Sequence, residues 1–259
     1  MFRLLPIRVL IGLYLFCLFE TSISRSFAIV GGAPPAGSFG SSVVMIFGSN
    51  RVFCNAVAIG RDLLLSSTQC VLPGATYKYA SNGRSGRPIL KDIARIERNP
   101  DFDLQKLLNY RATPDLALIK TSQALPAYIP PVPLSSATLA VGDTLYVVGY
   151  GVSVPGDTSS AGTARVAKLV VSKDPGRLQI RLFDPKHEGR DAGLGACSSD
   201  AGAPAFRLEG DTVAVVGIVS WSTGPGMSPG CGGLTGIVPV QPFRSWMVDT
   251  ARALGAPLD

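Results

Sequence analysis

Short runs of β-branched and aromatic residues recur along most of the chain, and Gly, Pro, Asn and Asp separate one run from the next. Runs of this length and composition are typical of strands, whereas alternating βαβ units would place long helical stretches between them. We expect eight strands, at residues 42–47, 52–59, 63–66, 116–120, 144–149, 165–171, 178–182 and 213–221. Their spacing predicts an all-β protein built as an antiparallel barrel or sandwich.

The C-terminal region has a helical pattern instead. Its apolar residues recur at intervals that place them on one helix face: Phe243, Trp246, Met247, Ala251 and Leu254. Pro242 lies at the start of this pattern and Gly255 just past its end. We expect a helix over residues 241–254 whose apolar stripe packs on the body of the protein, with partner binding as a weaker alternative.

The stretch PAYIPPVP, residues 126–133, lies near the middle of the chain. One interpretation is a linker between two halves of similar size, and the other is an extended connection over the surface. Both interpretations fit a protein with two barrels.

The N-terminus has the pattern of a signal peptide. Arg3 and Arg8 precede an uncharged apolar run at residues 9–19, and Ser26 and Ala28 offer small residues at a cleavage site. A membrane-spanning helix needs about 20 apolar residues, so a membrane anchor is the less favoured alternative. We therefore expect residues 1–28 to be removed and the protein to be secreted, extracellular or periplasmic, with no stable membrane anchor afterwards.

Hydrophobic residues make up 46% of the 259 residues and charged residues 16%, which is enough apolar material for a large core. Loss of three arginines and one glutamate with the signal peptide lowers the formal net charge from +6 to +4. The densest basic stretch has no interleaved aromatic residues: Arg84, Arg87, Lys91, Arg95 and Arg98. It favours a solvated face over a site for acidic polymers, and a nucleic-acid partner is not implied.

Five cysteines become four when Cys17 leaves with the signal peptide. An even number in an exported chain predicts two disulfides, although the residues alone leave all three pairings open. Neither a CxxC motif nor a Cys/His cluster occurs, so no metal site and no cofactor is expected.

Six short segments together carry a family resemblance. They are IVGG at 29–32, LLLSSTQC at 63–70, PDLALIK at 114–120, VVGYG at 147–151, CSSDAGAP at 197–204 and GIVSWS at 217–222. Each alone is a weak signal, but all six follow the order found in the chymotrypsin/trypsin-like serine protease family. The chain resembles that family over residues 29–254.

The resemblance implies a trypsin-like fold over residues 29–259. Two antiparallel six-stranded β-barrels are expected at approximately 29–130 and 131–240, with the cleft between them and a closing helix at 241–254. It also implies that Cys54 pairs with Cys70 and Cys197 with Cys231.

The resemblance assigns roles to three positions of the cleft. Asp115 matches the carboxylate that orients the catalytic imidazole, Gln69 stands at the position of the base, and Ala201 stands at the position of the nucleophile. An amide nitrogen is not basic near neutral pH, and a methyl group offers no nucleophile. We therefore expect a catalytically inactive homologue.

The neighbouring positions differ from the family pattern as well. Ser199 replaces a glycine whose N–H forms the oxyanion hole, and Ala203 replaces another glycine nearby. A residue with a Cβ resists the backbone angles that glycine adopts. The residues expected at the specificity pocket are Gly195 at its floor, which offers no charged anchor, with Ser220 and Ser222 along the cleft.

Ile29 and Asp200 match an ion pair of active relatives, in which the α-amino group of the first residue enters the protein body. Cleavage after Ala28 would free the Ile29 amine, and we expect the pair to order the loop at residues 197–203. The alternative is that Asp200 is a remnant without this role.

His187 is the one histidine of the chain, and it is expected to be exposed in a loop away from the base position. Ser198 and Ser199 border the nucleophile position without an evident base. The favoured function is binding of an unknown peptide or protein by a non-catalytic homologue. A serine endopeptidase with a displaced base or nucleophile is the alternative, and a surface that binds acidic polymers is a third.

Overall fold

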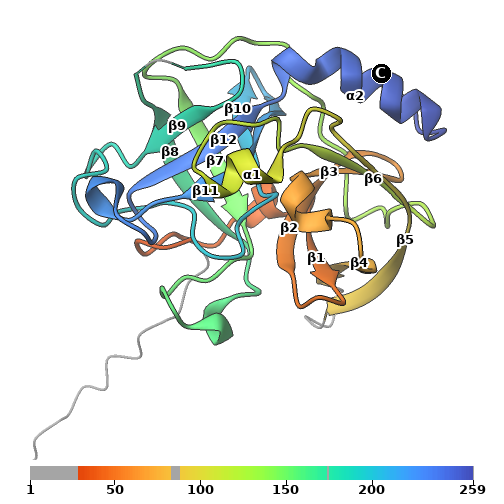
Figure 1. Ribbon diagram of the computed structural model, residues 1–259, viewed down its shortest axis with the longest axis horizontal. Helices are drawn as coiled ribbons and strands as arrows, with labels where there is room; N and C mark the ends of the chain where they lie inside the picture. Colours follow the sequence, from red (N-terminus) through yellow and green to blue (C-terminus); the bar gives the residue numbers. More distant parts are fainter. Residues whose placement is uncertain (1–28, 83–87, 174, 259) are drawn as a thin grey trace, which may run out of the picture.

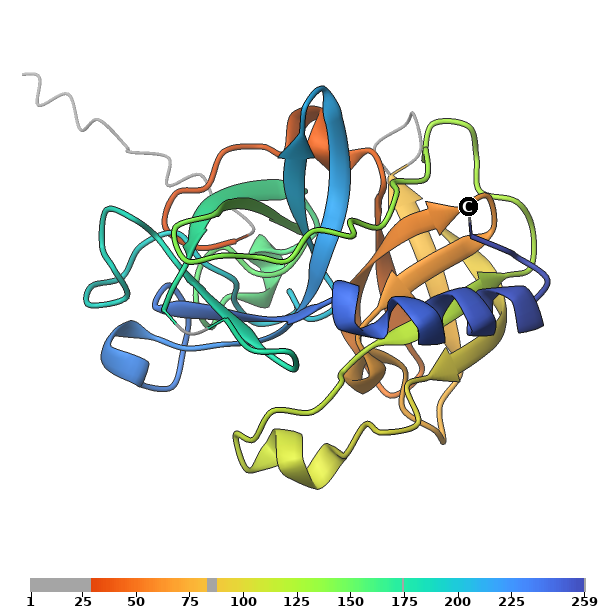
Figure 2. The same ribbon diagram turned by 90° about the horizontal axis from the view of Figure 1, so that it is seen from above.

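The computed structural model describes residues 29–82, 88–173 and 175–258. The predicted signal peptide at residues 1–28, together with Arg84 and Arg87, lies outside the described residues. The rest of the chain forms two barrels of strands side by side, and the C-terminal helix lies against the first of them (Figures 1 and 2).

The first barrel closes in the order β1-β2-β3-β6-β5-β4, and all its strand pairs are antiparallel. Its strands are β1 (Val43–Gly48), β2 (Phe53–Gly60), β3 (Leu63–Ser66), β4 (Tyr77–Asn82), β5 (Pro88–Arg98) and β6 (Ala117–Thr121).

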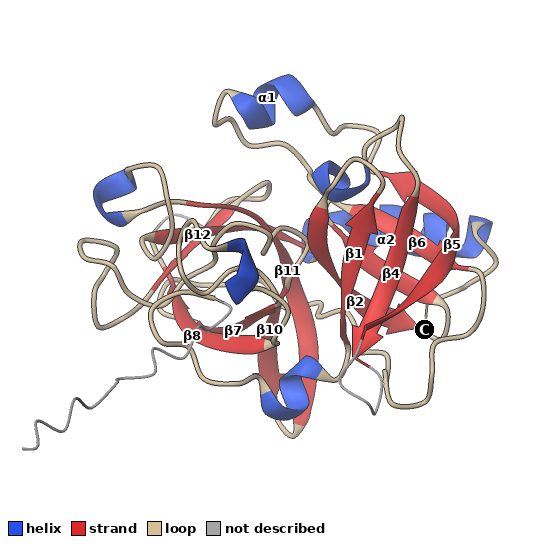
Figure 3. Cartoon of the chain, turned by 90° about the horizontal axis from the view of Figure 1, so that it is seen from below, coloured by secondary structure: helices blue, strands red, loops and turns tan. Residues whose placement is uncertain are grey.

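The second barrel closes in the order β10-β11-β12-β9-β8-β7, again antiparallel throughout. Its strands are β7 (Thr144–Gly149), β8 (Arg165–Val171), β9 (Ile180–Phe183), β10 (Pro204–Glu209), β11 (Thr212–Ser222) and β12 (Leu234–Pro239). Figure 3 separates these strands from the long loops around them. The prediction of two six-stranded barrels is confirmed.

Four strands were missed in the sequence: β4, β5, β10 and β12. β5 shows the reason most clearly, because side chains along most of its length are exposed and many are charged. It is a strand because its backbone pairs with β4 and β6, and backbone pairing does not require an apolar side chain. The expected strand at 178–182 is found slightly later, as β9.

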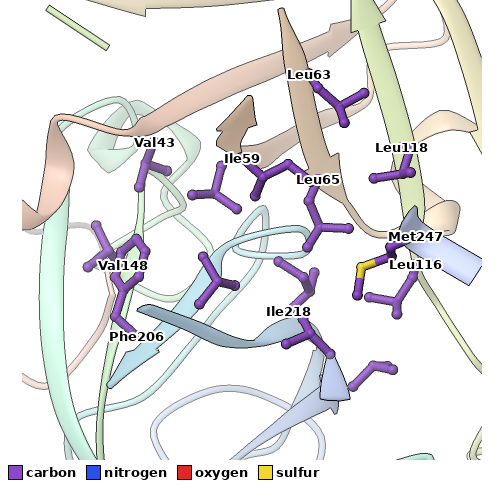
Figure 4. Close-up of a cluster of buried hydrophobic side chains, with 14 of the residues drawn as sticks. Val43, Ile59, Leu63, Leu65, Leu116, Leu118, Val148, Phe206, Ile218 and Met247 are labelled. Atoms are coloured by element: carbon purple, nitrogen blue, oxygen red, sulfur yellow. The ribbon is translucent and has the colours of Figure 1, made fainter. Parts of the chain in front are cut away.

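One cluster of buried apolar side chains is shared by the two barrels, besides the cluster inside each of them (Figure 4). Leu65 and Leu118 come from the first barrel, Phe206 and Ile218 from the second, and all four side chains are at most 1% exposed. Met247 of the C-terminal helix packs into the same cluster. The cleft is therefore held between two halves that are fixed to each other by a common core.

The C-terminal helix, α2 (Arg244–Ala253), follows a 3₁₀ turn, η5 (Gln241–Phe243), and buries Met247 and Ala251. Its stripe packs on the body, as expected. The other helical segments are short: η1 (Gly37–Gly40), η2 (Thr68–Val71), α1 (Leu104–Leu108), η3 (Thr158–Ser160) and η4 (Pro225–Met227). None of the helices in the described part of the chain is long and apolar enough to cross a membrane.

The proline-rich segment at 126–133 begins with a turn, in which Ile129 donates its N–H to the Pro126 carbonyl, and then runs from one barrel to the other. Val132 donates its N–H to the Ala58 carbonyl of the first barrel, and Leu134 forms a bridge with Val215 of the second. The predicted boundary between the barrels, at residues 130 and 131, falls within this connection.

Both disulfides are those that the resemblance implied, Cys54–Cys70 and Cys197–Cys231. The first joins β2 to η2, and the second joins the loop before β10 to the loop before β12. Each therefore anchors a loop that carries residues of the candidate site.

Candidate functional site

Asp115 lies just before β6 and is fully buried. Its Oδ1 accepts the Gln69 backbone N–H at 2.9 Å, and its Oδ2 accepts the Ser220 hydroxyl at 2.7 Å. Burial raises the pKa of the Asp115 carboxyl above its usual value, and these hydrogen bonds oppose that rise only in part.

Gln69 lies in η2, next to the disulfide residue Cys70. Its Nε2 donates to Asp115 Oδ2 at 2.5 Å and to the Ser220 carbonyl oxygen at 2.7 Å. Since both of these atoms are acceptors, the NH₂ group of the amide must face them. The side chain thus serves Asp115 as a hydrogen-bond donor and has no basic nitrogen to offer.

Ala201 lies in the loop between Cys197 and β10. Its carbonyl oxygen accepts the N–H of Asn55 at 2.9 Å, and its methyl group packs on the apolar cluster that contains Cys54 and Cys70. The position expected for the nucleophile is therefore held against the first barrel by backbone and apolar contacts.

Asn55, a fully buried residue of β2, was missed in the sequence. Its Nδ2 donates to the Ser199 carbonyl at 2.7 Å, and its Oδ1 accepts the Tyr150 N–H at 2.9 Å. The signal available was an asparagine within the otherwise apolar strand FCNAVAIG. Ser199 adopts a φ of 69°, in the left-handed region that favours glycine, and the bond from Asn55 helps to hold it there.

A groove of about 510 Å³ opens beside Gln69 and Ser220. One wall is the segment around α1, which stands out from the barrels (Figures 2 and 3). The opposite wall comes from β9 and β11 and from the loop around η4. The lining residues are Gln69, Leu107, Leu108, Tyr110, Arg111, Gln179, Arg181, Ser220, Trp221, Ser222, Thr223, Met227, Ser228 and Pro229.

Comparison with protein-family models matches residues 29–247 to the family described as Trypsin. The chain belongs to the trypsin family. The match begins at Ile29 and ends at Met247 within α2, so it includes both barrels and every residue of the groove.

Asp200 of this trypsin-family chain is fully buried beside the loop after β7. Its Oδ1 accepts the Gly151 N–H and its Oδ2 the Cys197 N–H, both at 2.9 Å. Burial raises its pKa to about 7, because these two bonds offset only part of the cost of desolvation. Among the described residues, no basic side chain lies within ion-pair distance of this carboxylate.

Ile29 is fully buried in the core of the second barrel, and the Val30 N–H donates to the Gly195 carbonyl at 3.1 Å. Ile29 has a φ of 52°, a left-handed conformation that is strained for a β-branched residue. In the full-length chain its nitrogen belongs to the peptide bond with Ala28, so the expected ion pair requires cleavage at that bond.

The expected pocket floor, Gly195, is closely covered by backbone. A Cβ on Gly195 would lie 3.3 Å from Gly232 Cα and 3.4 Å from Thr235 Oγ1. Ser222 lies at the groove and donates from its hydroxyl to the Gly230 carbonyl at 3.3 Å, whereas Ser220 belongs to the Asp115 cluster. Of the three residues expected at the pocket, the groove includes Ser220 and Ser222 but not Gly195.

His187 lies apart from Gln69, in a turn where its ring faces Gly193: a Cβ on Gly193 would be 2.7 Å from His187 Cδ2. It is half-buried rather than exposed as the sequence suggested, because this turn folds back on the loop before Cys197. Across the described ranges, no three His, Cys, Asp or Glu side chains gather as metal ligands would.

Proposed function

We propose that this trypsin-family chain is a secreted protein that does not hydrolyse peptides and instead binds an extended peptide segment along the groove. The observation that carries the proposal is the pair of residues at the base and nucleophile positions. The Gln69 amide donates to Asp115, and the Ala201 methyl packs on the first barrel.

The chemistry of acyl transfer supports this proposal. A serine hydroxyl is a weak nucleophile unless a base within hydrogen-bond reach removes its proton. Gln69 directs its amide N–H donors to Asp115 and to the Ser220 carbonyl, and an amide has no nitrogen that is basic near neutral pH, so no base would take up the serine proton there. The buried carboxylate of Asp115 is already bonded to Gln69 and Ser220.

The end of β11 that lacks a strand partner on one side supports peptide binding. β10 pairs with β11 only as far as Ile218, so the stretch from Ser220 to Ser222 has no strand partner on that side among the described residues. The N–H of Thr223 points to β12, where it donates to Leu234, and backbone groups of neighbouring strand residues point in opposite directions. Ser222 is therefore placed to pair with an extended peptide lying in the groove.

Secretion is supported by the predicted signal peptide and by the two disulfides, which persist in oxidising compartments. The trypsin-like fold with two bridges is typical of exported proteins.

The rival function is a serine endopeptidase with a displaced nucleophile. Ser220 favours it, because its hydroxyl lies 2.7 Å from Asp115 Oδ2, a carboxylate whose pKa is raised by burial. Its side chain is nevertheless almost fully buried.

The two functions are separated by a fluorophosphonate probe together with a peptide-hydrolysis assay on the mature chain. We expect the wild-type chain to remain unlabelled and inactive, and the Q69H/A201S variant provides the matched comparison in which base and hydroxyl are supplied. Stoichiometric labelling of the wild-type chain at Ser198, Ser199 or Ser220, removed by substituting that serine with alanine, would establish the endopeptidase instead.

A further inference from the structure

We infer that the groove selects acidic peptides, which Arg111 and Arg181 bind through their guanidinium groups. This inference rests on the proposed peptide-binding function and names the class of peptide that the same site takes. It is carried by the distribution of charge along the groove and by the apolar side chains between the two arginines.

The two arginines reach the groove from different halves of the molecule. Arg111 follows α1 in the part of the chain that builds the first barrel, and Arg181 lies on β9 of the second barrel (Figure 1). Arg111 and Arg181 are both exposed. A ligand that binds both arginines must therefore contact both walls of the groove.

Neither arginine has an acidic partner within 4.0 Å in the described part of the chain. Basic residues elsewhere do have partners, as in the pairs Lys120–Asp62 and Arg207–Asp143. The lining of the groove contains these two cations and no Asp or Glu. The nearest carboxylate of the site, Asp115, is buried behind Gln69 and Ser220 and is already hydrogen-bonded by both. The groove is thus a positively charged surface whose charge is not neutralised by the protein itself.

The same groove carries exposed apolar side chains. Leu108 is 62% exposed, Tyr110 95% and Met227 56%, and the half-exposed Trp221 also lines the groove. Large apolar side chains gathered on a soluble protein mark an interaction site. A volume of about 510 Å³ lies within the range of roughly 300–1,000 Å³ found for ligand sites.

These two properties favour a peptide over an acidic polysaccharide. A sulfated polymer could pair with the arginines but has no apolar groups to cover Tyr110, Trp221 and Met227. A peptide that carries both apolar and acidic residues satisfies both, since successive side chains of an extended peptide point to opposite sides and so reach both walls of the groove. The occupant that fits is a short extended segment with an acidic residue on each of its two sides and apolar residues beside them.

The test uses the mature chain and an immobilised panel of capped hexapeptides in which Asp and Glu are compared with Asn and Gln at every position. The tightest acidic peptide and its amide counterpart are then titrated in solution with wild type, R111Q, R181Q and the double variant. R61Q is the matched control, because Arg61 is an exposed arginine outside the groove. Thermal melts establish that each variant is folded.

We expect the wild-type chain to bind the acidic peptide about 4- to 25-fold more tightly than its amide counterpart, with each arginine contributing about 2- to 5-fold. The preference should fall in each single variant, vanish in the double variant, persist in R61Q and weaken with added salt.

Three outcomes would overturn the inference. Equal affinity for acidic and amide peptides would refute the acidic selectivity and leave peptide binding intact, whereas the absence of binding to any hexapeptide would refute the proposed function itself. A heparin hexasaccharide that displaces the peptide and outbinds every member of the panel through Arg111 and Arg181 would assign the groove to a polysaccharide.

Discussion

At the scale of single residues, Gln69 lowers the free-energy cost of burying the Asp115 carboxylate. A buried carboxylate is costly unless donors surround it, and Gln69 supplies one donor from its backbone and one from its amide. Gln69 therefore stabilises the fold even though it has no basic nitrogen, because its amide supplies a hydrogen-bond donor that the buried carboxylate requires.

The variant Q69A tests whether the Gln69 amide stabilises buried Asp115. Without the amide, Asp115 Oδ2 keeps only the hydrogen bond from the Ser220 hydroxyl, and the Ser220 carbonyl loses its bond from Gln69. We therefore expect the free energy of unfolding to fall by about 1–3 kcal/mol. Urea unfolding measures the change. Q179A is the control, because Gln179 lines the same groove at similar exposure but is not a donor to Asp115. A loss in Q179A as large as in Q69A would contradict the role given to Gln69.

Asp200 makes the stability of the protein depend on pH and on cleavage before Ile29. Its pKa of about 7 in the folded chain exceeds the ordinary value of 3.8, so between these two pH values the folded state holds a proton that the unfolded chain has released. The contribution of Asp200 to the free energy of unfolding is then greatest below about pH 4 and is lost as the pH rises through about 7. If the free amine at Ile29 pairs with the carboxylate, as the family resemblance implies, we expect the pKa of Asp200 to fall and this pH dependence to disappear.

The prediction compares two chains, one beginning at Ile29 and one carrying a short Gly-Ser extension before it. The extended chain should lose up to about 4 kcal/mol of unfolding free energy between pH 4 and 8 relative to the chain with the free amine. Asp115 also has a raised pKa but contributes equally to both chains, so the difference between the two curves reports on Asp200. Two parallel curves would show that Ile29 and Asp200 do not pair.

At the scale of elements, Asn55 connects β2 of the first barrel to two loops of the second. Its side chain bonds Ser199 in the loop before β10 and Tyr150 in the loop after β7. Because Ser199 is held in a left-handed conformation, the loop needs a partner that compensates for its strain.

We expect N55A to lower the free energy of unfolding by about 2–4 kcal/mol, since it leaves two buried backbone groups unpaired and creates a small cavity. Urea unfolding gives the loss, and faster hydrogen exchange at the Tyr150 amide locates it. N50A is the control, because Asn50 lies in an exposed turn. Unchanged exchange at Tyr150 in N55A would count against the connection.

The sequence predicted the elements with continuous apolar runs, such as β1 and β3, and the apolar stripe of α2. It missed β5, whose pairing with β4 and β6 depends on backbone hydrogen bonds between distant segments that no local pattern reveals. It placed Gln69 and Asp115 in one site through the family resemblance, and they do share hydrogen bonds. It missed Asn55, Arg111 and Arg181 because the role of each depends on which loops lie next to it in the folded chain, and no local pattern reveals that.

At the scale of the whole molecule, the disulfides act on the unfolded chain as much as on the folded one. Cys54–Cys70 spans 16 positions and Cys197–Cys231 spans 34, and a longer closed loop restricts the unfolded chain more. Removal of the two disulfides should therefore lower the free energy of unfolding by different amounts.

We expect the C54A/C70A pair to lower the free energy of unfolding by about 3 kcal/mol and the C197A/C231A pair by about 4 kcal/mol. Guanidinium unfolding under oxidising conditions measures both, and the reduced wild-type chain serves as the reference for the loss of both bridges. A larger loss from the shorter loop would mean that native contacts around Cys54 and Cys70, not loop closure, dominate.

The groove draws its walls from both barrels, with Arg111 on the side of α1 and Arg181 on β9. A ligand that contacts both walls can bind only when the two halves are folded and packed together. Ligand binding therefore raises the free energy of unfolding. At a ligand concentration 100 times the dissociation constant the gain is about 2.7 kcal/mol, which for a domain of this size raises the melting temperature by roughly 5–10 °C. A thermal-shift screen of candidate peptides would thus find the natural ligand without any assay of activity.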